Sequence, residues 1–123
     1  MAIVRIVNET KATELAVRAT VADSFFSRMR GLLGRSGLPK GEGLVIVPCK
    51  SVHAAFMRFP LDVLFLDRSG VVRHAMQLMP WRFSPIVSTA HLVLELPYGT
   101  IAAAATAPGD VIRIVLPEAS DEA

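Results

Sequence analysis

The chain has 123 residues, of which 52% are hydrophobic and 20% are charged, and its formal net charge at pH 7 is +2. This length suits one domain that buries roughly two-thirds of its unfolded surface, and the composition excludes a chain that is disordered throughout. The sequence pI is about 9.1, but the arginines are scattered and form no basic cluster, so we expect no nucleic-acid partner.

The N-terminal third predicts two strands and a helix. Residues 3–7, IVRIV, alternate as a short strand does, and residues 14–20, ELAVRAT, predict its partner across a polar turn. Apolar side chains then recur at helical spacing, which predicts an amphipathic helix over about 21–34. Thr20 and Asp23 would begin this helix as a variant of the capping box.

The middle of the chain predicts a buried hairpin. Residues 44–47, LVIV, form a short apolar strand that ends at a proline. Residues 61–67, LDVLFLD, are apolar at both odd and even positions, which is typical of a central strand covered on both faces. The DRSG sequence at 67–70 predicts a turn that leads into the returning strand at 71–78.

The C-terminal third begins with a long loop. Residues 79–91 contain two prolines and show no clean period, and loops of about a dozen residues are often functional. A strand at 92–96, a short helix at about 100–106 and a strand at 111–115 complete the predicted elements.

These elements predict an α+β, β-rich domain over residues 1–116, with six to seven strands in a strongly curved sheet or small barrel. Residues 117–123 predict a disordered acidic tail. A single cysteine excludes an intrachain disulfide and fits a reducing compartment. The N-terminus lacks the pattern of a signal peptide, and the apolar stretches are shorter than the ~20 residues that span a bilayer. We therefore expect a cytoplasmic protein without membrane contact.

Cys49 and His53 are the first candidates for chemistry, because a thiol and an imidazole are common partners in covalent catalysis. In an extended strand they would stand about 13 Å apart, so only a loop or helical turn could join them. The alternative is that Cys49 packs as a small hydrophobic residue. No second cysteine or paired histidines accompany them, and no cofactor motif is present, so we expect neither a metal nor a cofactor.

Asp62 and Glu95 are carboxylates set within apolar strands. A buried carboxylate is costly unless it is paired or accepts hydrogen bonds. The structural interpretation is that one of them holds Arg58, Arg30 or a run of backbone N–H groups. The functional alternative is that they line a pocket or act as acid and base.

Aromatic residues and histidines add to the candidate site. Trp81 and Phe83 in the long loop could form a wall for a ligand or partner, or pack over the end of the barrel. His74 shares its predicted strand face with Val72, Met76 and Leu78, which favours a structural role, whereas His91 at the end of the loop either lines a site or is exposed. The candidate pocket comprises Cys49, His53, Arg58, Asp62, Trp81 and Glu95.

Four phrases and one dipeptide carry a resemblance to a known family: SFFSRMRGLLGR at 24–35, VHAAFMRFPLDVLFLDRSG at 52–70, the proline-tryptophan step at Pro80-Trp81, VLELPYGT at 93–100 and PGD at 108–110. In order and spacing the chain resembles the uncharacterised domain-of-unknown-function family 192 (DUF192), small bacterial and archaeal proteins, from about residue 15 to 115. The resemblance implies a compact β-rich domain with no assigned activity. It also marks the positions that match the family pattern: Arg30, Gly31, Leu32, Met57, Pro60, Asp62, Glu95, Gly99, Gly109 and Asp110.

This sequence departs from the family pattern at Ala54, where similar members have a threonine after the histidine. Some branches lack the Cys-x-x-x-His phrase, which counts against Cys49 as a reagent common to the family.

Three functions remain open at the level of sequence. The first is a non-enzymatic accessory module that binds an unknown small molecule or protein partner through 79–91 and 49–58. The second is a small enzyme that uses Cys49 with His53, or Asp62 with Glu95. The third is a homo-oligomer whose apolar surface is its own interface.

Overall fold

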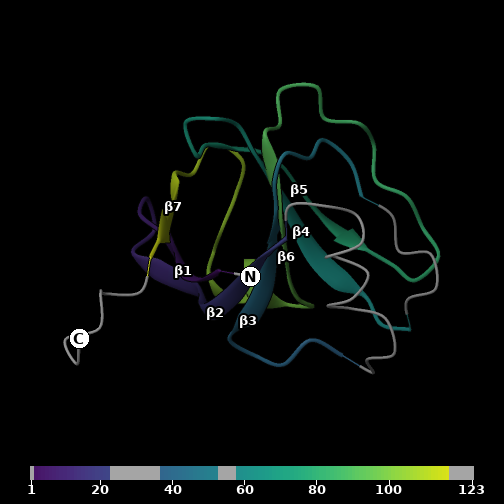
Figure 1. The fold of residues 1–123 in the computed structure, drawn as a ribbon, viewed down its shortest axis with the longest axis horizontal. Helices are drawn as coiled ribbons and strands as arrows, with labels where there is room; N and C mark the ends of the chain where they lie inside the picture. The colour runs from purple at the N-terminus through teal and green to yellow at the C-terminus, as the bar shows by residue number, and fades with distance from the viewer. Residues whose placement is uncertain (1, 23–36, 53–57, 117–123) are drawn as a thin grey trace.

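The structure is a computed structural model that describes residues 2–22, 37–52 and 58–116, and seven strands in these ranges form one mixed sheet (Figure 1). The elements are β1 (Ile3–Asn8), β2 (Thr13–Ala22), β3 (Glu42–Ile46), β4 (Leu61–Leu66), β5 (Val72–Leu78), β6 (Leu92–Pro97), α2 (Thr100–Ala103) and β7 (Ile112–Val115). Their order across the sheet is β5-β4-β6-β3-β2-β1-β7. The β2–β3 pair is parallel, and the other neighbours are antiparallel.

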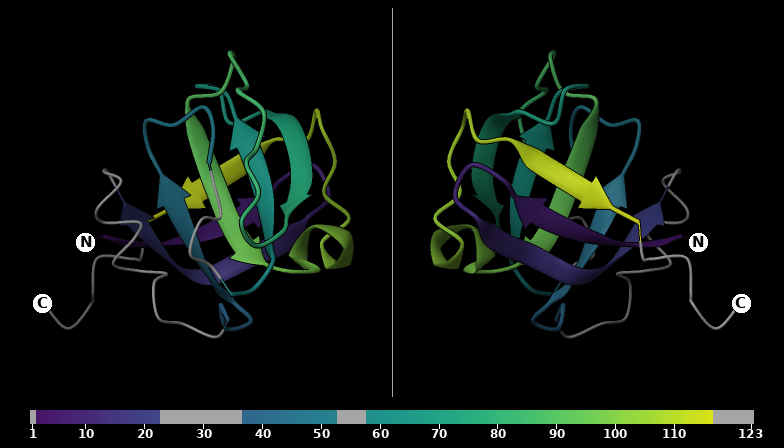
Figure 2. Two further views of the ribbon diagram at one scale, coloured as in Figure 1. Left: turned by 90° about the vertical axis from the view of Figure 1, so that its right-hand side faces the viewer. Right: turned by 90° about the vertical axis from the view of Figure 1, so that its left-hand side faces the viewer.

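The sheet curls so strongly that its two edge strands touch at one point. Val71, just before β5, forms a bridge with Val111, just before β7. Two hydrogen bonds flank the bridge, from the Val72 N–H to the Asp110 carbonyl (2.9 Å) and from the Ile112 N–H to the Gly70 carbonyl (2.8 Å). Figure 2 shows the resulting strongly curled half-barrel, with the short helix α2 at one end. The predicted β-rich α+β domain with a curved sheet is thereby confirmed.

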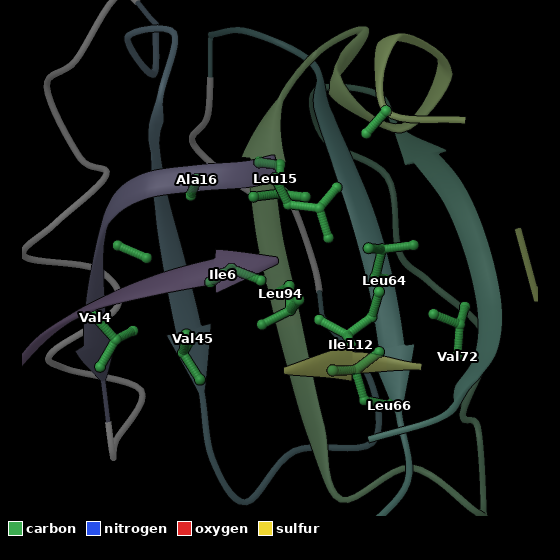
Figure 3. Packing of buried hydrophobic residues seen from close by; sticks show 13 residues of the cluster. Val4, Ile6, Leu15, Ala16, Val45, Leu64, Leu66, Val72, Leu94 and Ile112 are labelled. Atoms are coloured by element: carbon green, nitrogen blue, oxygen red, sulfur yellow. The ribbon is translucent and has the colours of Figure 1, made fainter. Parts of the chain in front are cut away.

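The concave side of the sheet holds one hydrophobic core. Side chains from β1, β2 and β7 face those from β4, β5 and β6 across the interior (Figure 3). Ile6, Leu64 and Leu94 at its centre have no exposed surface. Burying side chains of this size contributes about 1.5–3 kcal/mol each, so this core is a main source of stability.

A second core covers the convex side. Leu61, Val63 and Phe65 of β4 point to this face, opposite to Leu64, because side chains alternate along a strand. Ala90 from the 79–91 loop is buried among them. All six residues of β4 are buried, which confirms the prediction of a strand covered on both faces.

The predicted helix at 21–34 is corrected at its start. Val21 and Ala22 are the last residues of β2, where Ala22 pairs with Ile46 of the parallel neighbour β3. Thr20 also lies within this strand and is no helix cap, because the ladder with β3 engages its backbone. Residues 23–34 of that prediction lie outside the described residues, as does the predicted tail at 117–123.

The second predicted helix is present but shorter than 100–106. It ends at Ala103, and Ala105 follows with a positive φ of 55°, a left-handed conformation that cannot continue an α-helix.

A bulge in β5 changes which residues share a face. Phe65 pairs with His74, but the next residue, Leu66, pairs with Val72, so Arg73 is an extra residue. Val72 therefore joins the concave core, while His74 lies on the convex side with its ring 5.5 Å from that of Phe65. The predicted face shared by His74, Met76 and Leu78 is thus confirmed, and only the inclusion of Val72 is wrong, because of the bulge.

Candidate functional site

The 79–91 loop runs beside the segment 49–52. Three main-chain hydrogen bonds join them: Cys49 N–H to His91 O (2.9 Å), Val87 N–H to Lys50 O (2.8 Å) and Ser84 N–H to Val52 O (2.8 Å). The Val52 N–H also donates to the Ser84 hydroxyl (2.8 Å). The structure thus brings residues 79–91 next to residues 49–52. The sequence had placed the candidate site in these two segments.

The outer edge of this loop is apolar and exposed. The exposed fraction is 60% for Trp81, 75% for Phe83 and 77% for Ile86. Val87 and Ala90 of the same loop instead pack against the convex core. Most of the surface of these two aromatic side chains is therefore exposed to solvent.

An open cavity of about 680 Å³ lies where the loop meets the start of the 49–52 segment and the β4–β5 turn. Its lining includes Cys49, Lys50, Arg68, Ser69, Ser88 and His91. The volume falls in the range of small-molecule sites, roughly 300–1,000 Å³. Of the predicted site residues, Cys49 lines this cavity.

Cys49 is half-buried, and its thiol donates a hydrogen bond to the Ser51 carbonyl oxygen (3.0 Å). It also packs against the convex core. His53 lies outside the described residues, so the predicted Cys49–His53 pair stays a prediction.

Asp62 stabilises the start of α2. It is 1% exposed, and its Oδ2 accepts hydrogen bonds from the Gly99 N–H (3.0 Å) and the Ile101 N–H (2.8 Å). A run of backbone N–H groups, one of the predicted solutions, is thus what holds this carboxylate. Arg58, the alternative partner, is exposed. Asp62 does not line the cavity.

Glu95 is fully buried, but on the other face of the sheet. In the register of β4 and β6, Glu95 stands opposite Val63 of the convex core, whereas Asp62 stands opposite Leu96 of the concave core. Since facing residues on paired strands point to the same side, the two carboxylates point to opposite sides. They cannot work as one acid/base pair.

A buried polar network, which the sequence did not reveal, ties β1 to the loop before β7. Asn8 is completely buried, and its side-chain amide donates to Thr106 Oγ1 (3.0 Å) and Asp110 Oδ2 (2.9 Å). The Lys11 ammonium group also donates to Asp110 Oδ2 (2.9 Å). The Asn8 amide and the Lys11 ammonium hold the pKa of Asp110 below its usual value. In the sequence, PGD at 108–110 stands out only as a family phrase, because Asn8 and Lys11 lie about a hundred residues away from Asp110.

Asp67 organises the β4–β5 turn at the edge of the cavity. Its Oδ1 accepts the N–H groups of Ser69 (2.9 Å) and Val71 (3.0 Å), and its Oδ2 pairs with Arg73 (2.8 Å). The Val71 N–H, together with the Arg73 guanidinium, lowers the pKa of Asp67. The negative charge of this carboxylate is thus already compensated.

Within 2–22, 37–52 and 58–116, no group of three or more His, Cys, Asp and Glu side chains is arranged to hold a metal ion. The same ranges contain no helix with the length and apolar content needed to cross a bilayer.

Two solved structures share this fold. A Sinorhizobium meliloti protein described as "a putative transcription regulator" superposes with a TM-score of 0.73 at 23% identity, over 91% of this chain and 92% of that one. A protein of unknown function from Novosphingobium aromaticivorans gives a TM-score of 0.74 at 21% identity, over 90% and 83%. At these identities the likeness shows the fold alone.

Closer relatives are archaeal. A UPF0127 protein of Pyrococcus furiosus is 34% identical over 108 residues, which are 84% of this chain and 91% of the relative. A UPF0127 protein of Thermococcus sibiricus is 35% identical over 102 residues, 78% of this chain and 65% of that longer protein. The model of the DUF192 family, described as "Uncharacterized ACR", matches residues 6–114. The chain therefore belongs to the DUF192 family, whose curated archaeal members are named UPF0127 proteins.

Proposed function

We propose that this DUF192 domain is a non-enzymatic accessory module that binds a small molecule in the cavity between residues 49–50, 67–69 and 88–91. One observation carries the proposal: main-chain hydrogen bonds fix the 79–91 loop against 49–52 beside an open cavity of about 680 Å³. A long loop held in one conformation by its backbone is preorganised, so binding costs less conformational entropy.

The positions of the carboxylates favour binding over catalysis. Asp62 is engaged in holding α2, and Glu95 lies on the opposite face of the sheet. The cavity lining instead offers cations, hydroxyls and an imidazole. Groups of this kind orient a polar ligand without a covalent step.

A thermal-shift screen of the whole chain against a panel of small metabolites tests the proposal. A ligand that prefers the native state raises the melting temperature. For each hit, amide hydrogen exchange should slow at Cys49, Ser84 and Val87, whose N–H groups join the two segments. Amides of the distant β1–β2 pair serve as the internal control and should not change.

Hits that leave the exchange of 49–52 and 84–91 unchanged would place binding elsewhere and contradict the proposal. A screen with no hit would also contradict it, and would direct attention to a protein partner at the exposed side chains of Trp81, Phe83 and Ile86.

The enzymatic alternative keeps one supporting observation, since Cys49 lines the cavity. Because its thiol donates to the Ser51 carbonyl, we expect Cys49 in the folded protein to react with a thiol reagent at neutral pH no faster than a free peptide thiol. A markedly faster reaction would show an activated thiolate and favour the enzyme.

A further inference from the structure

We infer that the ligand of this cavity carries a phosphate group; the inference rests on the proposed function and narrows its ligand class. Three chain segments that are distant in sequence, 48–50, 67–69 and 88–91, contribute to the lining. None of them contains a glycine-rich phosphate motif, so the argument depends on the side chains that the fold brings together.

Two cationic side chains line the cavity, and both have hydrogen-bond donors available for a ligand. The Lys50 ammonium donates one hydrogen bond, to the Ser88 carbonyl (2.6 Å), which fixes its position and leaves two of its three protons for a ligand. The Arg68 guanidinium is exposed and makes no hydrogen bond or ion pair with any described residue. Its planar fork of N–H donors suits two oxygens of one anion.

The carboxylate in the lining does not cancel this charge. Asp67 accepts hydrogen bonds from two backbone N–H groups and forms an ion pair with Arg73. Its negative charge is therefore balanced by groups of the same hairpin. Lys50 and Arg68 therefore leave a net excess of positive charge at the cavity. A dianionic phosphate ester matches that excess better than a neutral or singly charged ligand does.

Hydroxyl groups and an imidazole complete the lining. Ser69, Ser88 and Thr89 bring hydroxyl groups from two sides, and His91 lies at the end of the loop. A phosphate group has several acceptor oxygens that point in different directions, whereas the two oxygens of a carboxylate lie in one plane. Donors spread over three segments fit the first geometry, and the cavity volume leaves room for a small organic group attached to the phosphate.

Inorganic phosphate is the probe for the test, titrated into the whole chain at constant ionic strength, with chloride and acetate as comparison anions. Two readouts are followed: the melting temperature and the rate at which a thiol reagent modifies Cys49, the chain's one cysteine. We expect phosphate, but not acetate or chloride, to raise the melting temperature with saturation and to slow modification of Cys49, since the thiol lines the same cavity.

Two double variants, each of which removes two positive charges, test where phosphate binds. Lys50→Gln with Arg68→Gln removes the two cavity cations and should weaken phosphate binding by about tenfold or more. Arg18→Gln with Lys40→Gln removes two exposed cations near the start of β3, at the end of that strand away from the cavity. This control should bind phosphate within about twofold of the wild type.

Equal loss of affinity in both double variants would show a general charge effect and overturn the inference, as would equal responses to phosphate and acetate. If phosphate fails but a metabolite from the screen slows exchange at 49–52 and 84–91, the phosphate assignment is wrong and the proposed binding function stands. If neither binds, both are wrong.

Discussion

At the scale of single residues, Asp62 shows why a family signature can be structural. Asp62 was a candidate because it is a carboxylate within an apolar strand, and its Oδ2 accepts two N–H groups at the start of α2. A helix of four residues cannot supply its own partners for these groups. The carboxylate thus fastens the chain after β6 to the beginning of β4.

Asp62→Ala should lower the free energy of unfolding by about 2–4 kcal/mol, because it leaves two backbone N–H groups without an acceptor. Asp62→Asn keeps one side-chain oxygen for the same two groups and should cost clearly less. Urea denaturation at neutral pH measures both. A cost for Asp62→Ala below about 0.5 kcal/mol would contradict the role given to this carboxylate.

At the scale of elements, the turns decide how the edges of the sheet meet. Gly70 ends the β4–β5 turn with a φ of 83°, and a Cβ at this position would lie 2.6 Å from the Ile112 carbonyl oxygen. Gly109 has a similar φ of 95°, but a Cβ there would have no neighbour within 4 Å. A comparison of the two glycines therefore separates two energetic costs of adding a Cβ. One is the cost of the left-handed backbone conformation, and the other is the cost of a steric clash with a neighbouring strand.

Gly109→Ala should cost about 1–2 kcal/mol, because only the left-handed conformation is penalised. Gly70→Ala carries the same penalty, and the Ile112 backbone must also move, so it should cost at least about 1 kcal/mol more. Denaturation of the two variants side by side gives the difference. Equal costs would mean that β7 can shift freely and that the contact with the turn is unimportant.

At the scale of the whole molecule, buried polar groups help to keep the curled sheet closed. The network of Asn8, Lys11, Thr106 and Asp110 joins β1 to the loop that leads into β7. Asp110 also accepts the Ala107 N–H (3.0 Å), so one carboxylate holds both sides of the junction. Loss of its charge should therefore loosen the closure of the sheet.

The sign of the pH dependence follows from the lowered pKa of Asp110, whose usual value is 3.8. The unfolded chain takes up this proton first as the pH falls, so the stabilisation is fully present above the usual value. It is lost as the pH drops through the lower native value. In Asp110→Asn, stability at pH 7 should be reduced, and the difference from the wild type should shrink below about pH 4.

Urea denaturation of wild type and Asp110→Asn between pH 7 and 3 measures this effect. Glu9→Gln is the control, because Glu9 is exposed and belongs to a surface ion pair with Arg113. This variant should follow the wild type. A constant offset between Asp110→Asn and wild type across the whole range would contradict the assignment.

Most of the local structure and the family could be predicted from the amino-acid sequence. Alternating and continuous apolar runs predicted the strands, and DRSG predicted the turn at 67–70. The absence of a hydrophobic period predicted the loop at 79–91, and the four phrases together with the Pro80-Trp81 step identified the family. These features are carried by consecutive residues, because side-chain periodicity and turn conformation are local properties of the chain.

The remaining features depend on contacts between segments that are distant in sequence. The bulge at Arg73, the extension of β2 through Ala22, and the separation of Asp62 from Glu95 depend on which strands pair and in what register. The meeting of Lys50 with Arg68 at one cavity likewise depends on the turn after β4 folding against the 79–91 loop. Pairing between distant segments is fixed by burial of the two cores as a whole, and no short stretch of sequence encodes it.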